Sequence, residues 1–177
     1  DPNVHVLDPC TGTGSYLTAV LDKIVATLKE QGDDGLVAAE AKQAALSRIH
    51  GFELLPAPFV IAHLKIGIAL QRMGVPLNAT AGERASVYLT NALTGWVDSS
   101  EHPPLPFPEF VAERDAADAV KRDQSILVVL GNPPYNGFAG VSGREEGGLV
   151  EPYKVGLADK WDITKNKLDD LYIRFFR

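Results

Sequence analysis

Four consecutive residues, Asn132-Pro133-Pro134-Tyr135, have the types and the order needed to hold a planar amine. Two successive prolines impose an extended backbone without amide donors, so nearby carbonyl groups are left without a local partner. The Asn132 side-chain carbonyl and the Pro133 backbone carbonyl can then both accept hydrogen bonds from one exocyclic amine. Tyr135 offers an aromatic face on which a base can stack, which is worth about 1–3 kcal/mol. We predict an amine-binding site; the structural alternative is a rigid turn that leaves a buried strand.

A second candidate site is the turn Asp8-Pro9-Cys10-Thr11-Gly12-Thr13-Gly14. Its two glycines let the backbone bend sharply and approach a ligand closely. A dinucleotide-binding loop has a third glycine three residues after the second, and here Leu17 stands at that position, so we do not expect a dinucleotide. The acid at position 8 suits a cationic amino group, such as that of the methionine part of S-adenosylmethionine. A Gly-x-Gly pair alone is equally typical of a structural turn.

Glu53 is a candidate for binding the ribose of the same ligand. It ends the second predicted strand, and a carboxylate at that place can accept hydrogen bonds from both ribose hydroxyls. The separation from Gly14 is longer than the usual roughly 20 residues, and we expect a helix over 36–46 to account for the excess. Without the glycine turn, a glutamate at a strand end is more often a solvated surface residue.

These residues need strands and helices to position them, and the apolar periodicity predicts both. The predicted strands cover 4–7, 48–53, 86–89 and 125–130, and the predicted helices cover 17–28, 36–46, 56–73 and 109–122. Alternating strands and helices predict an α/β fold with an open, mostly parallel, Rossmann-like sheet. Ligands of such sheets bind beyond the carboxyl ends of the strands, where the pattern puts Asp8, Glu53, Asn91 and Asn132.

The same pattern predicts how these elements pack. The unbroken apolar run at 125–130 indicates a central strand covered on both faces. The helix at 56–73 is almost wholly apolar, which predicts burial on most of its sides. The inward residues expected of the helix at 109–122 are Phe110, Val111, Ala117 and Val120. An apolar helical stripe is also expected at 168–177.

Composition restricts the possible partners. The 177 residues, 45% of them hydrophobic, predict one domain with a sizeable core. A net charge of −6 provides no general attraction to a phosphate backbone, so most of any grip on DNA must come from elsewhere. A single cysteine excludes an internal disulfide, and the four histidines lack metal-ligand spacing, so we expect no metal site and a cytoplasmic setting. No leader or membrane-spanning run is visible, and the start at Asp1 leads us to expect a piece of a longer protein.

Together, the glycine turn and the Asn-Pro-Pro-Tyr box resemble those of the amino-methyltransferases that act on the N6 amine of adenine in DNA. The resemblance implies S-adenosylmethionine as the cofactor and methyl transfer by Asn132, Pro133, Pro134 and Tyr135. The cofactor-binding residues that it implies are Asp8, Pro9, Thr11, Gly12, Gly14, Tyr16, Leu17, Glu53 and Asn91. Asn91 departs from the family pattern, because the family usually has an aspartate there that contacts the cofactor's adenine.

The resemblance also implies a larger parent protein. The fold would be that of a class I S-adenosylmethionine-dependent methyltransferase, incomplete here, with a cofactor-binding part at 1–95 and a catalytic-box part at 124–177. The segment 169–176 resembles the helix after the flexible loop in large single-chain restriction-modification enzymes, especially those of type ISP. In those enzymes the methyltransferase is joined to a helicase-type translocating ATPase, a nuclease and a target-recognition domain, which this sequence lacks. DNA is therefore the expected partner, through the parent chain.

Two further expectations concern the substrate and the alternatives. An adenine paired in a duplex must flip out to reach the box, and the glycine-rich segment 137–148 would order over it. An RNA or protein-amide N-methyltransferase could use the same box, because any planar nitrogen with two hydrogens meets the same acceptors. A different class of answer is a catalytically silent cofactor-binding module of a larger assembly. Cys10 is interpreted as a small packing residue and not as a nucleophile.

Overall fold

The computed structural model describes residues 3–32, 35–96, 105–135 and 174–175. The strands are β1 (His5–Asp8), β2 (Ile49–Glu53), β3 (Val87–Leu89) and β4 (Ile126–Val129). The helices are α1 (Ser15–Glu30), α2 (Val37–Ser47), α3 (Pro56–Arg72) and α4 (Pro108–Asp123), with a short 3₁₀ helix, η1, at Ala79–Ala81. The bounds of these strands and α-helices agree with the predicted ones to within two residues at every end. The extra helix expected between the glycine turn and Glu53 is α2.

The four described strands form one open sheet in which all pairs are parallel. The strand order is β3-β2-β1-β4. Glu53 pairs with Leu89, so β2 and β3 end opposite each other, whereas the last residue of β1, Asp8, pairs with Gly51, two residues before the end of β2. The predicted α/β fold with a parallel, Rossmann-like sheet is confirmed.

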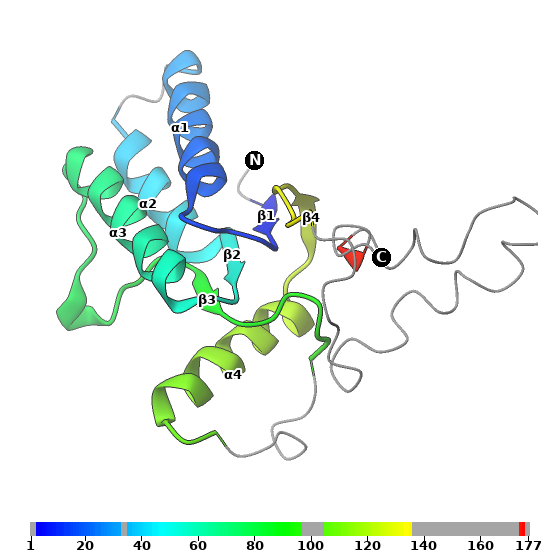
Figure 1. Ribbon diagram of the computed structural model, residues 1–177. Helices are drawn as coiled ribbons and strands as arrows, with labels where there is room; N and C mark the ends of the chain where they lie inside the picture. Colours follow the sequence, from blue (N-terminus) through cyan, green and yellow to red (C-terminus); the bar gives the residue numbers. More distant parts are fainter. Residues whose placement is uncertain (1–2, 33–34, 97–104, 136–173, 176–177) are drawn as a thin grey trace, which may run out of the picture.

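Helices cover both faces of this sheet (Figure 1). Neighbouring residues of a strand point to opposite faces, so Val87 joins the core under α1, α2 and α3, whereas Tyr88 packs on the side of α4. The larger core lies on the first side and includes Leu17, Leu21, Ile49, Ile66 and Leu70. The smaller one, which includes Phe52, Ala117 and Val120, lies on the second.

Local sequence explains where several helices begin. Gly14 precedes α1 with a left-handed backbone, φ 78°, that other residues adopt at a cost. Pro56 and Pro108 occupy the first positions of α3 and α4, where a missing amide donor does no harm and the fixed φ suits a helix.

The prediction that β4 is a central strand covered on both faces is wrong for the described part of the chain. Only β1 pairs with β4 among the described strands, and the side chains of Leu127 and Val129 are 72% and 61% exposed. An apolar run shows that a strand can be buried on both faces, but it does not reveal whether other strands and helices cover it.

Two burial predictions for helices are also wrong. Only the line Ala62, Ile66 and Leu70 of α3 is buried, because the helix meets the rest of the structure along one side. Its exposed apolar residues are Val60, Ile61, Leu64 and Ile68. In α4, Ala117 and Val120 are buried as expected, but Phe110 is 42% exposed and makes an edge contact with Phe107. The buried residues of α4, Ala117, Asp118 and Val120, all lie in its second half.

Some expectations lie outside the described residues. They are the glycine-rich segment 137–148 and, apart from Arg174 and Phe175, the helical stripe at 168–177. In the ranges that are described, no helix is both long enough and apolar enough to cross a membrane.

The exposed face of α3 yields a paired prediction. Leu70→Ala removes a completely buried side chain and is expected to lower the free energy of unfolding by about 2–5 kcal/mol. Leu64→Ala, on the same helix but 59% exposed, is expected to change it by no more than about 0.5 kcal/mol. Urea unfolding of the two variants checks this, and equal losses would mean that both sides of α3 are buried.

Candidate functional site

The residues predicted to act together end neighbouring parallel strands. Asp8 is the last residue of β1, and Glu53 is the last residue of β2. Asn91 follows β3 by two residues, and Asn132 follows β4 by three. All four strands run in the same direction, so these positions lie together at the carboxyl ends of the strands, as predicted. We refer to this side of the sheet as its carboxyl edge, or simply the edge.

The glycine turn between β1 and α1 is closed by backbone contacts. The amide of Thr11 donates to the carbonyl of Phe52 at 3.0 Å, which ties the turn to β2. The hydroxyl of Thr11 donates to the carbonyl of Asp8 at 3.0 Å. At Gly14, a Cβ would lie 3.0 Å from the Cβ of Ala62 in α3. The turn therefore needs glycine here for space as well as for its positive φ.

Glu53 contacts the glycine turn directly. One carboxylate oxygen accepts the amide of Gly12 at 2.8 Å, and the other accepts the amide of Leu55 at 2.8 Å. Each carboxylate oxygen can accept a further hydrogen bond, so both remain able to meet hydroxyl groups of a ligand. The carboxylate thus joins the end of β2 to the turn after β1.

Asp8 is a completely buried acid. Its Oδ1 accepts the amide of Cys10 at 3.0 Å, whereas Oδ2 has no hydrogen-bond partner among the described residues. Burial raises the pKa of Asp8 to about 6; the Cys10 hydrogen bond opposes this rise and the nearby charge of Glu53 adds to it. A cationic group at Oδ2 would relieve this cost, which is the chemistry predicted for position 8.

Gly131 is a site residue that the sequence analysis missed. It directly precedes Asn132, and a Cβ placed on it would lie 2.6 Å from Oδ1 of Asp8. The amide of Leu130 donates to the carbonyl of Leu7 at 3.0 Å and extends the pairing of β1 with β4 to this point. The glycine turn therefore contacts the residue that directly precedes the Asn-Pro-Pro-Tyr box. The available sequence signal was a glycine between an apolar strand and the box.

The Asn-Pro-Pro-Tyr box is accessible. Tyr135 is 76% exposed, and its hydroxyl donates to Oδ1 of Asn132 at 2.8 Å. The amide oxygen predicted to accept an incoming amine is thus engaged by the tyrosine in this structure. A base that stacks on the ring of Tyr135 would compete for the same oxygen.

The remaining predicted cofactor residues divide into exposed and buried ones. Tyr16, in the first turn of α1, is 48% exposed, whereas Leu17 is 1% exposed and packs in the larger core. Leu17 approaches Gly51, where a Cβ would lie 2.7 Å from its Cδ1. The side chain of Leu17 thus packs α1 against β2 within the larger core. Pro9 lies beside Gly131, with its Cδ 3.5 Å from the position of a Cβ there.

Cys10 is a free thiol in the turn. Burial, followed by the negative charges of Asp8 and Glu53, raises the pKa of this thiol to about 12. The thiolate needed for nucleophilic attack is therefore strongly disfavoured. The chemistry of the site agrees with the interpretation of Cys10 as a packing residue.

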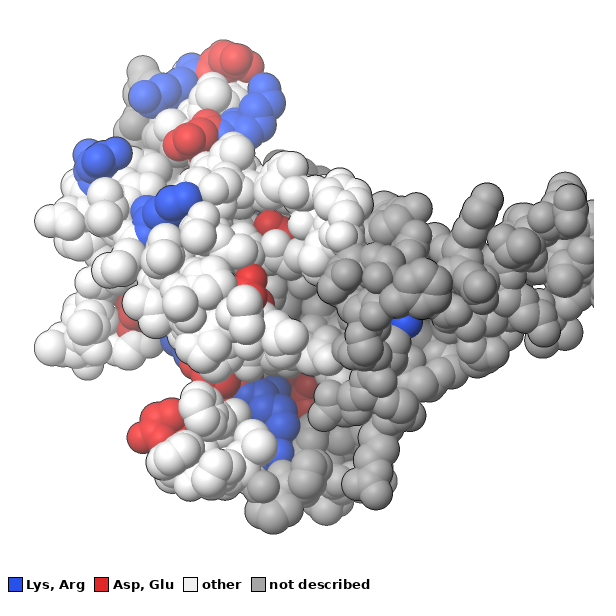
Figure 2. Space-filling model, in the orientation of Figure 1, with Lys and Arg blue, Asp and Glu red and all other residues white. Residues whose placement is uncertain are grey.

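Two further observations limit the chemistry of the described surface. No group of three or more His, Cys, Asp and Glu side chains in the described ranges is arranged to hold a metal ion. Figure 2 shows basic side chains scattered among acidic ones, with no continuous basic patch over the described part of that face.

No protein-family model and no curated protein matches this chain. It is similar to solved structures, among them a DrdV–DNA complex determined by cryo-electron microscopy, with 26% identity over 99% of this chain and a TM-score of 0.68. The ATP-dependent type ISP restriction-modification enzyme LlaBIII bound to DNA shows 25% identity over 98% of this chain and a TM-score of 0.64. A nuclease-deletion mutant of the type ISP enzyme LlaGI, in complex with a DNA substrate mimic, shares the fold at 20% identity over 98% and a TM-score of 0.64.

The chain spans 16%, 12% and 14% of the lengths of those three chains, respectively. These likenesses support a relation between this chain and type ISP restriction-modification enzymes.

The contact between Gly131 and Asp8 predicts a large effect of one methyl group. Gly131→Ala forces a Cβ against a buried carboxylate and is expected to destabilise the fold by about 1–3 kcal/mol. The matched control is Gly67→Ala in α3, where a Cβ meets no atom within 4 Å and better helix propensity is expected to stabilise by up to about 1 kcal/mol. Thermal unfolding of both variants checks this; a neutral Gly131→Ala would contradict the contact.

The raised pKa of Asp8 predicts a pH dependence. The folded state binds this proton more tightly than the unfolded chain, in which the ordinary value is 3.8, so Asp8 destabilises the fold above about pH 6. The difference in stability between the wild type and Asp8→Asn should shift in favour of the wild type by up to about 3 kcal/mol as pH falls from 8 to 4. Chemical unfolding across that range checks this. His50, whose pKa burial lowers to about 4, is present in both proteins and cancels. A difference independent of pH would contradict the prediction.

Proposed function

We propose that this chain is the cofactor-binding and catalytic part of a DNA adenine-N6 methyltransferase that works within a larger restriction-modification enzyme. The observation that carries the proposal is the contact of Asp8, in the glycine turn, with Gly131, next to the Asn-Pro-Pro-Tyr box. A methyl donor held by the turn and an amine held by the box would be neighbours there. Proximity of this kind is the main requirement of a direct transfer between two bound reactants.

S-adenosylmethionine fits the residues of the turn. Asp8 offers the amino group of the methionine part a buried carboxylate oxygen, Oδ2, that has no hydrogen-bond partner among the described residues. Glu53 offers two carboxylate oxygens to the ribose hydroxyls, and the turn itself provides a glycine backbone that a ligand can approach closely. When bound, S-adenosylmethionine supplies a methyl group whose bond to the sulfonium sulfur breaks as the attacking nitrogen bonds to its carbon.

The Asn-Pro-Pro-Tyr box supplies what the amine needs. The N6 lone pair of adenine is delocalised into the ring, and acceptors for both N6 hydrogens help to localise it on nitrogen. The side chain of Asn132 and the carbonyl of Pro133 are those acceptors, with Pro134 keeping the backbone extended and Tyr135 stacking on the base. Positive charge that develops on the nitrogen faces carbonyl dipoles that are already in place.

DNA binding belongs, in this proposal, to the parent enzyme. The similar structures are of large chains bound to DNA or a DNA mimic, while the present chain is acidic and spans less than a fifth of their length. A target-recognition domain, a helicase-type ATPase and a nuclease would be supplied by the rest of that protein. The target adenine would reach the box by flipping out of the duplex.

Substitutions in the box test the catalytic assignment in the parent enzyme. Asn132→Ala is expected to lower the rate of methyl transfer to DNA at least 100-fold, because a preformed acceptor is lost. Tyr135→Ala should cost roughly 5- to 150-fold through lost stacking, whereas Tyr135→Phe keeps the ring and should retain most activity. Transfer of a labelled methyl group to DNA measures all three.

The exposed Leu64→Ala variant, far from the box in sequence, is the control and should remain fully active. Full activity of Asn132→Ala and Tyr135→Ala would overturn the catalytic assignment. Cofactor binding without methyl transfer by the wild-type parent would instead favour a silent cofactor-binding module. Isothermal titration with S-adenosylmethionine measures cofactor binding separately from methyl transfer. Neither box variant should weaken cofactor binding, so a loss of activity in these variants reports on the transfer step.

A further inference from the structure

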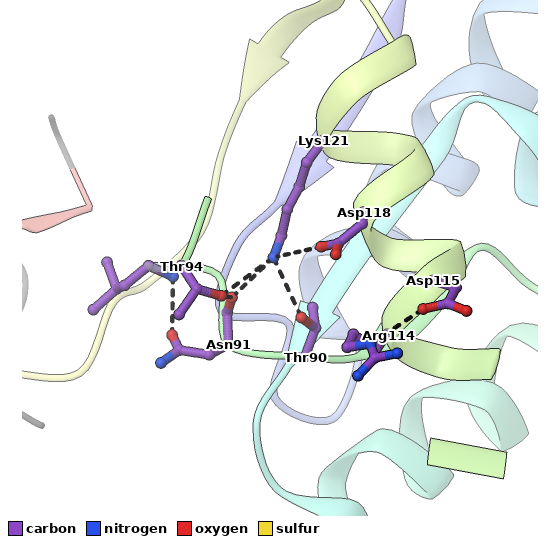
Figure 3. A network of polar contacts seen from close by, with 8 residues as sticks. Thr90, Asn91, Thr94, Arg114, Asp115, Asp118 and Lys121 are labelled. Carbon is purple, nitrogen blue, oxygen red and sulfur yellow. Dashed lines mark hydrogen bonds and ion pairs between the residues drawn. The ribbon is translucent and has the colours of Figure 1, made fainter. Parts of the chain in front are cut away.

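Lys121, in the last turn of α4, is a largely buried cation that faces the loop after β3. We refer to residues 90–94 as the β3 loop. The side chains of Lys121 and of Asp118, one turn earlier, are only 10% and 9% exposed. Figure 3 shows the ammonium group between α4 and the β3 loop.

The ammonium group makes several contacts with the β3 loop at once. It donates to the backbone carbonyl of Asn91 at 3.2 Å and to the hydroxyls of Thr90 and Thr94, each at 3.4 Å (Figure 3). Asp118 lies at 3.5 Å and is its ionic partner. The ring of Phe52 in β2 lies 5.6 Å from Nζ, within the range of a cation–π contact.

Burying an ammonium group costs free energy of desolvation, so the contribution of Lys121 must come from the contacts that its ammonium group makes. Desolvation lowers the pKa of Lys121, and only the neighbouring Asp118 opposes this. A methionine of similar length could fill the same space, but it would take from the buried carboxylate of Asp118 its ion pair with Lys121. What the charged group adds is a set of directed hydrogen bonds that hold the β3 loop in one conformation.

The loop has its own internal contacts, which these bonds complete. Oδ1 of Asn91 accepts the amide of Leu93 at 2.9 Å, and the hydroxyl of Thr94 donates to the carbonyl of Asn91 at 2.9 Å. Ala92 packs against the smaller core. The side-chain oxygen of Asn91 thus shapes the loop itself, and Lys121 holds the same residue through its backbone.

The position of the β3 loop relates it to the proposed cofactor. The amide of Thr90 donates to the backbone carbonyl of Glu53 at 2.8 Å, so the loop adjoins the proposed ribose-binding acid. The strand order β3-β2-β1 places the β3 loop, Glu53 and Asp8 side by side in that sequence. S-adenosylmethionine has its base, its ribose and its methionine part in the same linear order. With the ribose at Glu53 and the amino group at Asp8, the base extends over the β3 loop.

We propose that Lys121 is a positioning residue for the nucleoside half of the cofactor, acting by holding the β3 loop in the conformation that contacts the base. This inference rests on the proposed function, because it takes the ligand of the glycine turn to be S-adenosylmethionine. The sequence contained no signal for it, since a lysine in the last turn of a helix is ordinarily solvated.

The experiment compares two ligands by isothermal titration of the intact protein. S-adenosylmethionine carries both halves, whereas 5′-methylthioadenosine carries the nucleoside and lacks the amino-acid group. Lys121→Met is expected to weaken the binding of both ligands by the same factor, about tenfold or more. Lys121→Arg keeps the charge and the donors and should recover much of that loss. Asp8→Asn is the comparator, since it should weaken S-adenosylmethionine alone.

Melting temperatures and a second variant separate positioning from folding. Thr90→Val removes one acceptor of Lys121 without removing a buried charge, and a smaller loss shared by both ligands is expected if Lys121→Met fails to fold. Unchanged affinity of Lys121→Met or Thr90→Val for 5′-methylthioadenosine would overturn the role of Lys121. Failure of Lys121→Arg to recover any of the affinity that Lys121→Met loses would also overturn it. A wild type that binds neither ligand would overturn the proposed function and this inference with it.

Discussion

The carboxylate of Asp8 is completely buried against the backbone of Gly131, and the candidate site depends on this contact. It exists because β1 pairs in parallel with β4, which brings the end of one strand beside the end of the other. A side chain at position 131 would force the two strand ends apart. The buried acid raises the energy of the folded protein at neutral pH, and that cost is typical of residues kept for a ligand.

The glycine turn and the β3 loop, which lie at the same edge, are each held by contacts from one face of the sheet. On the side of α1, the glycine turn is held by the Glu53 carboxylate and by close packing on Ala62 of α3. On the side of α4, Lys121 holds the β3 loop, whose first amide bonds to Glu53. Glu53 is therefore the centre of the edge, between the turn and the loop. Rigid elements on both faces limit the movement of groups that a ligand would meet.

Burial was predictable for apolar residues on the side of a helix that faces the sheet. Leu17, Ala117 and Val120 lie in the core because their spacing places them toward the sheet. The exposure of Leu64, Leu127 and Val129 could not be predicted in this way. Apolar residues on a second face show only that burial is tolerated, since the number of neighbours of a helix or strand depends on tertiary packing.

The sequence by itself determined the order and type of the elements and the residues at each strand end. Periodicity, turn glycines and prolines are local properties, and they were sufficient to predict a parallel α/β sheet with Asp8, Glu53, Asn91 and Asn132 at one edge. Only the tertiary structure decided that Gly131 touches Asp8 and that Lys121 points inward to the β3 loop. Both contacts join residues far apart in the chain, and which strands and helices become neighbours depends on packing that no local pattern records.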